Sequence, residues 1–192
     1  MVSLPALAQA WPDKPVKLIV NFPPGGVADT LARGIAPALS DAIKQPAQLT
    51  LPAPASRAPA ATFTATTING DKVGLSSFRG KPLVINFFAA WCDPCRREAA
   101  AFVQLDHRFA GRVNLLSVAV RTPQLSSVRG FVHDHDMSWP VVWDEHGHLI
   151  DPYHVLGQPI TYIIDAQGRV VYRIIGQTTE QRVGGVLDRL LA

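Results

Sequence analysis

The chain has very little cysteine: Cys92 and Cys95 are the only two among its 192 residues. A structural zinc site commonly needs two such cysteine pairs, or one pair with spaced histidines, so a single pair is a poor zinc pattern. A bridge across two intervening residues closes a very short loop and removes little entropy from the unfolded chain. These absences favour redox use of the pair over the two alternatives, a zinc half-site and a stabilising bridge.

The chain also lacks concentrated charge and long apolar runs. Its formal net charge is +3, and the basic residues are scattered, which argues against a nucleic acid as partner. No apolar run approaches the roughly 20 residues that span a bilayer, so we predict no transmembrane segment. With 47% hydrophobic and 17% charged residues, the composition is typical of a globular protein with one good core.

The first 60 residues differ in composition and sequence pattern from the rest. Residues 1–10 end in the small-x-small pattern AQA, and we interpret them as a signal-peptide remnant that directs the chain to the periplasm or cell envelope of a bacterium; a chance alanine-rich leader is the alternative. Residues 11–44 have the pattern of a short βα appendage, and residues 45–60 are rich in Pro and Ala, as in a semi-extended linker. In an oxidising compartment a lone cysteine pair is oxidised unless a partner reduces it.

Residues 61–192 have the pattern of one compact α/β redox domain, with a central mixed sheet and helices on both faces. We expect a β-hairpin at its start, because segments 63–68 and 73–75 flank the turn sequence NGD. Further strands are expected at 82–89, 113–120, 140–143, 160–165 and 169–175, and helices at 93–109, 125–136 and 179–191.

The cysteine pair follows a continuous apolar segment and opens a predicted helix. Cys92 therefore lies at the amino end of that helix, where the helix dipole stabilises a thiolate. We predict that Cys92 is the nucleophile and that Cys95, one turn further on, is the resolving thiol. Pro94 is tolerated in the first turn and stiffens it. Asp93 opposes thiolate formation, since it adds negative charge near the sulfur.

Two other residues carry possible chemistry. Glu98 lies three residues after Cys95 and shares its helical face, so it could take the Cys95 proton during resolution. The alternative is a surface glutamate in a run of charged residues. Pro159 directly precedes the predicted strand 160–165, and an X-Pro bond at such a place can be cis.

Four motifs in this domain match a known pattern in order and spacing. They are NGDKVGLSSFRGKP at 69–82, VINFFAAWCDPCRRE at 84–98, GQP at 157–159 and IIDAQGRV at 163–170. Residues 61–192 thereby resemble the thioredoxin fold, and more narrowly the TlpA/ResA/CcmG-type envelope thiol–disulfide oxidoreductases. The resemblance implies that Cys92 and Cys95 are the redox pair, with no other cofactor, that Glu98 is an acidic modulator, and that Pro159 is a cis-proline beside the sulfurs.

The resemblance also bears on client binding, and the sequence departs from the family there. A client-binding surface is expected from Trp91, Pro94, Gln158 and Ile160. Ile160 replaces the threonine that commonly follows the cis-proline, which alters the client-binding surface that the resemblance implies. Asn86 fills a position where thioredoxins proper carry a buried acid.

The family further implies the partners. We expect an oxidised protein client, such as apocytochrome c or a copper-site assembly protein, and a membrane thiol–disulfide carrier that supplies electrons. The alternative is a copper-binding metallochaperone that uses Cys92, Cys95 and one histidine, because sulfur together with imidazole suits copper. The candidate histidines lie between the cysteines and the GQP motif: His133, His135, His146, His148 and His154.

The amino-terminal stretch has a resemblance of its own. The sequence WPDKPVKLIVNFPPGG at 11–26, within residues 11–45, is similar to the start of mature tripartite tricarboxylate (Bug) periplasmic solute receptors. One strand and one helix cannot form the two-lobed cleft of such a receptor. We therefore interpret the segment as a fusion remnant, and solute binding at 23–26 is a third functional hypothesis.

Overall fold

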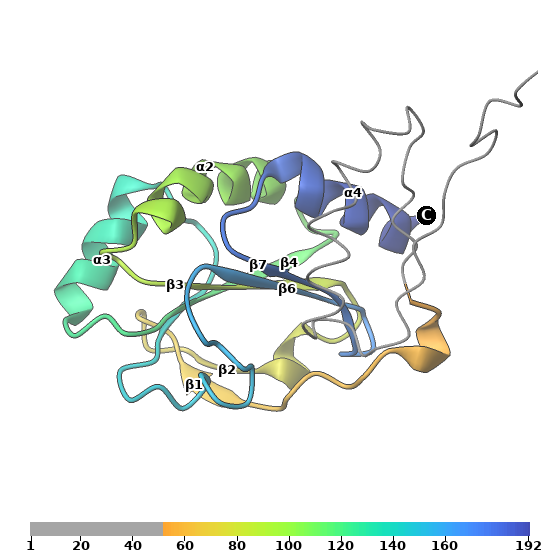
Figure 1. The fold of residues 1–192 in the computed structure, drawn as a ribbon, viewed down its shortest axis with the longest axis horizontal. Helices are drawn as coiled ribbons and strands as arrows, with labels where there is room; N and C mark the ends of the chain where they lie inside the picture. Colours follow the sequence, from red (N-terminus) through yellow and green to blue (C-terminus); the bar gives the residue numbers. More distant parts are fainter. Residues whose placement is uncertain (1–51) are drawn as a thin grey trace, which may run out of the picture. The chain divides into compact units, whose positions relative to one another are not determined.

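The computed structural model describes residues 52–192 (Figure 1). The signal-peptide remnant, the βα appendage and the solute-receptor resemblance predicted for residues 1–45 lie outside the described residues. Within residues 52–192, no helix is both long and apolar enough to cross a membrane. The elements are η1 (Pro54–Ser56), β1 (Thr64–Thr66), β2 (Lys72–Gly74), η2 (Leu75–Phe78), β3 (Leu83–Phe88), α2 (Asp93–Arg108), β4 (Asn114–Ala119), α3 (Leu125–Asp134), β5 (Val141–Trp143), β6 (Ile160–Ile164), β7 (Val170–Ile175) and α4 (Glu180–Leu191).

The central sheet has five strands in the order β5-β4-β3-β6-β7. Strand β3 pairs in parallel with β4 and antiparallel with β6, so the predicted mixed sheet is confirmed. All six residues of β3 are buried, as expected for the middle strand of a sheet that is covered on both faces. The β3–β6 register puts Phe87 opposite Ile160, which brings the end of β3 beside the start of β6.

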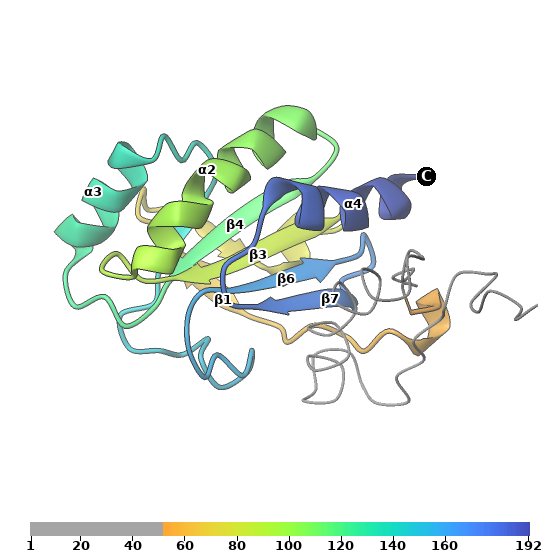
Figure 2. The same cartoon turned by 45° about the horizontal axis from the view of Figure 1, so that its top comes forward.

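The α-helices of the described chain lie on one face of the sheet (Figures 1 and 2). We expected helices on both faces, but the core on the other face contains the short η2, beside the β1–β2 hairpin, and no residue of α2, α3 or α4. The strand order explains this arrangement. The connections β3–α2–β4 and β4–α3–β5 step in the same direction across the sheet, and two crossovers of the usual right-handed sense then put their helices on the same face.

Side chains alternate between two cores along each strand. Leu83, Ile85 and Phe87 point into the core under the hairpin, whereas Phe88 points toward the helices and packs on Phe131 of α3, with ring centroids 4.7 Å apart. This alternation is what a period of two residues produces in a strand that is covered on both faces.

The predicted hairpin is confirmed, with small differences at its ends. Strands β1 and β2 pair antiparallel, but the second strand stops at Gly74, one residue earlier than expected. Leu75 begins η2 instead, because the Ser77 hydroxyl accepts a hydrogen bond from the Gly74 amide (3.1 Å) and closes a local turn. Helix α3 likewise ends at Asp134, and the expected helical residue Asp136 has a φ of 51°.

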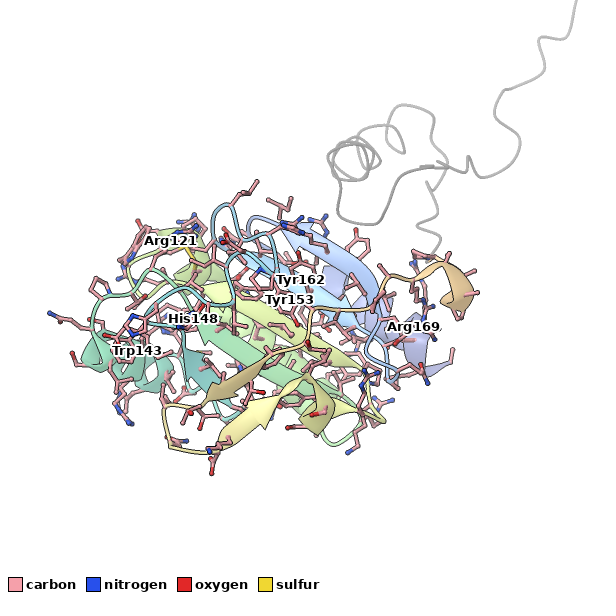
Figure 3. The ribbon with its side chains drawn as sticks, turned by 90° about the horizontal axis from the view of Figure 1, so that it is seen from below. Arg121, Trp143, His148, Tyr153, Tyr162 and Arg169 are labelled. Atoms are coloured by element: carbon pink, nitrogen blue, oxygen red, sulfur yellow. A yellow bond between two sulfur atoms is a disulfide. The ribbon has the colours of Figure 1, made fainter. Side chains whose placement is uncertain are left out.

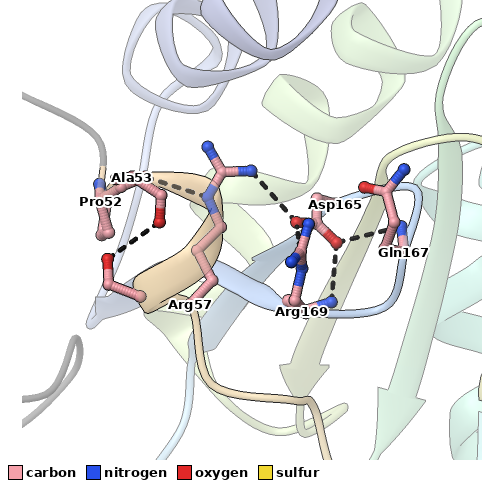
Figure 4. Close-up of polar contacts among 7 residues, drawn as sticks. Pro52, Ala53, Arg57, Asp165, Gln167 and Arg169 are labelled. Atoms are coloured by element: carbon pink, nitrogen blue, oxygen red, sulfur yellow. Dashed lines mark hydrogen bonds and ion pairs between the residues drawn. The ribbon is translucent and has the colours of Figure 1, made fainter.

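The end of the predicted linker is attached to the domain (Figure 4). The Arg57 guanidinium donates to Asp165 Oδ2 at 3.1 Å, and Arg169 Nε donates to the same oxygen at 3.1 Å. The Ala60 amide donates to the Gly168 carbonyl at 2.9 Å. Residues 52–60 therefore run along the β6–β7 turn and are held there by an ion-pair cluster and by backbone hydrogen bonds.

Candidate redox site

The two cysteines lie where β3 ends and α2 begins, and they are joined by a disulfide. Cys92 is the N-cap of α2, and its sulfur accepts a hydrogen bond from the Cys95 amide at 3.3 Å. Pro94 occupies the first turn of the helix, where its missing N–H costs nothing. The local sequence therefore places Cys92 Sγ against the free amide groups of a helix start, a position that favours a thiolate.

A loop distant in sequence completes the surroundings of the sulfur. The Gln158–Pro159 peptide bond is cis, and the Gln158 carbonyl oxygen lies 4.0 Å from Cys92 Sγ. Strand β6 carries this loop to the site, because its antiparallel pairing with β3 puts its first residue beside the end of β3. Cys92 and Pro159, which the sequence separates by 67 positions, are thereby brought to one edge of the sheet.

Glu98 is not a surface residue: its side chain is 1% exposed, one turn after Cys95 on α2. Its Oε1 accepts from Asn86 Nδ2 at 2.9 Å, and its Oε2 accepts from the Thr178 amide at 2.8 Å. Burial raises the pKa of Glu98 to about 7, and the hydrogen bonds from Thr178 and Asn86 lower it only in part. A carboxyl group with this pKa can both accept and release a proton near neutral pH.

The expected client-binding residues differ in exposure. Trp91 is 57% exposed, and its indole N–H donates to the Arg121 carbonyl at 2.8 Å. Pro94 and Gln158 are half-buried. Ile160 is 1% exposed and packs in the core under the hairpin, so its side chain is not placed to contact a client.

Leu156 is a surface feature that the sequence reasoning missed. It is 92% exposed and lies in the loop that leads to Pro159. Leu156 and Trp91 are thus two exposed apolar side chains on the segments that flank Cys92 in the sequence and in space, the loop before Pro159 and the turn before α2. The available signal was an apolar residue in a short glycine-containing stretch directly before the X-Pro bond.

A pocket of about 290 Å³ opens beside Trp91, between the start of α2 and helix α3. Its walls are apolar at Ala90, Pro123 and Phe131, and polar at Arg96. Neither cysteine lines this pocket, which lies on the α3 side of Trp91.

The histidines do not gather around the sulfurs. Residues 52–192 contain both cysteines and all six histidines, and they hold no group of three or more His, Cys, Asp or Glu side chains placed to bind one metal ion. His146 and His148 contact each other, while His135 stacks on Phe131 with ring centroids 4.3 Å apart. The donor set that the copper alternative requires is not assembled in this part of the chain.

A disulfide between residues three apart, at a helix start beside an X-Pro loop in a mixed sheet of this strand order, defines a thioredoxin-like thiol–disulfide oxidoreductase. Residues 56–173 match the model of the AhpC/TSA family, and the chain belongs to this family.

Named relatives agree with this class. The chain is 32% identical over 128 residues to the thioredoxin-like protein YneN of Bacillus subtilis, and the matched region covers 66% of this chain and 75% of the relative. It is 33% identical over 129 residues to the thiol–disulfide oxidoreductase ResA of Geobacillus kaustophilus, with 67% and 74% covered. A secreted disulfide oxidoreductase of Mycobacterium tuberculosis has a similar structure, with a TM-score of 0.60 and 26% identity over 67% of this chain and 96% of that one.

Proposed function

We propose that this oxidoreductase works in the bacterial envelope as a reductant of protein disulfides, with Cys92 as the nucleophile and Cys95 as the resolving thiol. The observation that carries the proposal is the buried carboxyl of Glu98, one turn beyond Cys95, with a pKa near 7. An envelope location is supported by the similarity to a secreted oxidoreductase.

The reduction proceeds in two exchanges. In the first, the Cys92 thiolate attacks one sulfur of the client disulfide, so that a Cys92–client bond forms, the client bond breaks, and the other client sulfur leaves as a thiolate that takes a proton from water. In the second, the Glu98 carboxylate takes the Cys95 proton and the Cys95 sulfur attacks Cys92. The Cys92–Cys95 disulfide forms, the second client sulfur leaves and is protonated, and the client has gained two electrons and two protons.

The charges around the sulfurs support the reducing direction. The buried Glu98 carboxyl lies one turn after Cys95 and opposes the stabilisation that the helix start gives to a thiolate at this site. Asp93, which directly follows Cys92, pairs with Arg96 at 3.1 Å, so these two charges largely offset each other near the sulfurs. A dithiol whose thiolate is weakly stabilised gives up its electrons more readily, whereas a strongly stabilised one is an oxidant.

Steady function needs a source of electrons, since each client reduction leaves the Cys92–Cys95 pair oxidised. A membrane thiol–disulfide carrier would return the pair to the dithiol by the same exchange in reverse. An apocytochrome or a metal-site protein with an oxidised cysteine pair is the kind of client that the exposed apolar residues Trp91 and Leu156 suit.

A single-turnover experiment tests the proposal. The protein is reduced with dithiothreitol, freed of excess reagent, and mixed anaerobically with insulin, whose disulfides serve as the probe. We expect about one insulin disulfide to be lost per protein molecule, none with Cys92→Ser, and an accumulating mixed disulfide with Cys95→Ser. If the reduced wild-type protein leaves insulin intact but binds one Cu(I) ion with a histidine ligand, the metallochaperone alternative replaces the proposal.

A further inference from the structure

Arg121 connects two segments that both adjoin Cys92, namely Trp91 and the 155–158 loop. On one side, its carbonyl oxygen accepts the indole N–H of Trp91 at 2.8 Å. On the other, its guanidinium donates to the Gln158 side-chain oxygen at 3.1 Å and to the Val155 carbonyl at 2.9 Å. Figure 3 shows Arg121 at the end of the sheet opposite Arg169, which is the end where the loop before Pro159 meets the start of β6.

The backbone at this position is unusual. Arg121 has a φ of 48°, in the left-handed region that residues other than glycine rarely adopt, at a cost on the order of 1 kcal/mol. Such a conformation persists only where the surroundings impose it. It allows one residue to present its carbonyl to Trp91 and its side chain to the loop around Val155.

The next residue fixes the strand end that carries Arg121. The buried Thr122 hydroxyl accepts from the Ala90 amide at 3.1 Å and donates to the Val120 carbonyl at 3.2 Å. The Thr122 carbonyl accepts the indole N–H of Trp143 at 2.8 Å. The segment after β4 is therefore held to the end of β3 and to β5, which makes it a rigid support for the Arg121 side chain.

We propose that Arg121 is a positioning residue, which holds Trp91 and the 155–158 loop at a fixed separation as the two walls of the client-binding site. This inference rests on the proposed function, because it assumes that a protein client docks between these walls. The side chain does not take part in the exchange of electrons. Its effect is on how well an extended client segment is accommodated beside Cys92, and a small disulfide that reaches the sulfur without touching both walls is insensitive to it.

The test variant is Arg121→Gly, because glycine accepts a φ of 48° and retains the carbonyl that binds Trp91. In single-turnover reductions at varied insulin concentration, we expect its apparent KM for insulin to rise about three- to tenfold, the usual effect of losing two hydrogen bonds between partly exposed groups, while the maximal rate changes little. The rate with the small disulfide 5,5′-dithiobis(2-nitrobenzoic acid) stays within twofold of wild type. Arg121→Lys, which can reach one of the two acceptors, restores part of the loss.

Arg97→Ala is the matched control. Arg97 is an exposed arginine of the same helix as the cysteines, and its Nε donates to Gln177 at 3.1 Å, away from both walls. Arg97→Ala removes the same charge as Arg121→Gly but leaves both walls intact, so we expect its KM for insulin to stay unchanged. An equal loss in both variants, or an equal loss with insulin and with the small disulfide in Arg121→Gly, overturns the positioning role.

A second measurement needs no client and separates this proposal from the proposed function. Amide hydrogen exchange at Val155 and Leu156, whose N–H groups bond within their own loop, is expected to accelerate at least threefold in Arg121→Gly and not in Arg97→Ala. Unchanged exchange overturns the role of Arg121 even if insulin is reduced normally. Faster exchange in a protein that does not reduce insulin leaves the positioning of the loop established and refutes only the reductase assignment.

Discussion

The Asn86 side-chain amide donates a hydrogen bond to the Glu98 carboxyl at 2.9 Å, from the middle of β3 to the second turn of α2. Asn86 also donates to Thr161 Oγ1 of β6 at 3.3 Å, so the amide joins three elements beneath the disulfide. The buried acid of this site thus comes from the helix, and the strand supplies a neutral donor that lowers the pKa of Glu98 in part.

Replacing Asn86 with aspartate should move the titration of Glu98 upward. Asn86→Asp removes the amide donor and puts a second carboxyl group against the first, so the pKa of Glu98 rises above about 7. The pH dependence of mixed-disulfide resolution, followed by stopped flow, should shift to higher pH. Thr161→Val is the control, since it removes the other partner of Asn86 and leaves the bond to Glu98. A profile that does not move in Asn86→Asp would contradict the role of this pair.

Glu98 itself should control the rate of the resolving step. In Glu98→Gln no carboxylate is present to accept the Cys95 proton, and we expect resolution to slow by about 100-fold at neutral pH, the lower end for a positioned general base. The rate should also lose its inflection near pH 7. Attack by Cys92 on the client, measured separately with Cys95→Ser, should change far less. Glu145→Gln, an exposed glutamate on the loop after β5, serves as the control.

The same carboxyl should make folding stability depend on pH. The folded protein keeps the Glu98 proton up to about pH 7, whereas the unfolded chain releases it near 4.5. Between these values the folded state binds more protons, so the free energy of unfolding falls as the pH rises, by about 3 kcal/mol in all. Urea unfolding of the oxidised protein at pH 4.5 and pH 8 should show this loss in the wild type and not in Glu98→Gln. An equal loss in both proteins would assign it to other groups.

The attachment of residues 52–60 should contribute to stability. Arg57→Ala removes a nearly buried ion pair with Asp165 and leaves that carboxylate to Arg169 and the turn amides, so we expect the free energy of unfolding to fall by about 1–3 kcal/mol. The turn geometry should persist, because the remaining bonds to Asp165 stay. Ser56→Ala, which loses an exposed hydroxyl bond to the Ala53 carbonyl, should cost well under 1 kcal/mol. Similar midpoints for wild type and Arg57→Ala in urea would show that the segment is only loosely held.

The sequence predicted the elements that depend on local patterns. The continuous apolar run before the cysteines, the helix that begins with them and the NGD turn all contain their own signals, and the structure has them within one or two residues. The face of the sheet on which the helices pack was harder to predict. It depends on the strand order, and only pairing between distant segments determines that order.

The site shows the same division. Cys92 and Cys95 are recognisable from spacing alone, and Pro159 from its place before a strand. The Thr178 amide binds Glu98 from 80 positions away, and Arg121 contacts residues that are 30 or more positions away. Neither set of contacts has a local signature in the sequence. The family resemblance places Ile160 in the client-binding surface, but strand pairing turns its side chain into the core.

The reduction potential of the Cys92–Cys95 couple, measured by equilibration with glutathione, tests the central claim most directly. Potentials in this fold run from about −270 mV in a reductant to about −120 mV in a strong oxidant. Because the buried Glu98 carboxyl disfavours negative charge at the sulfurs, we predict a value closer to −270 mV. A value near −120 mV would make the protein an oxidant of its clients and would contradict the account.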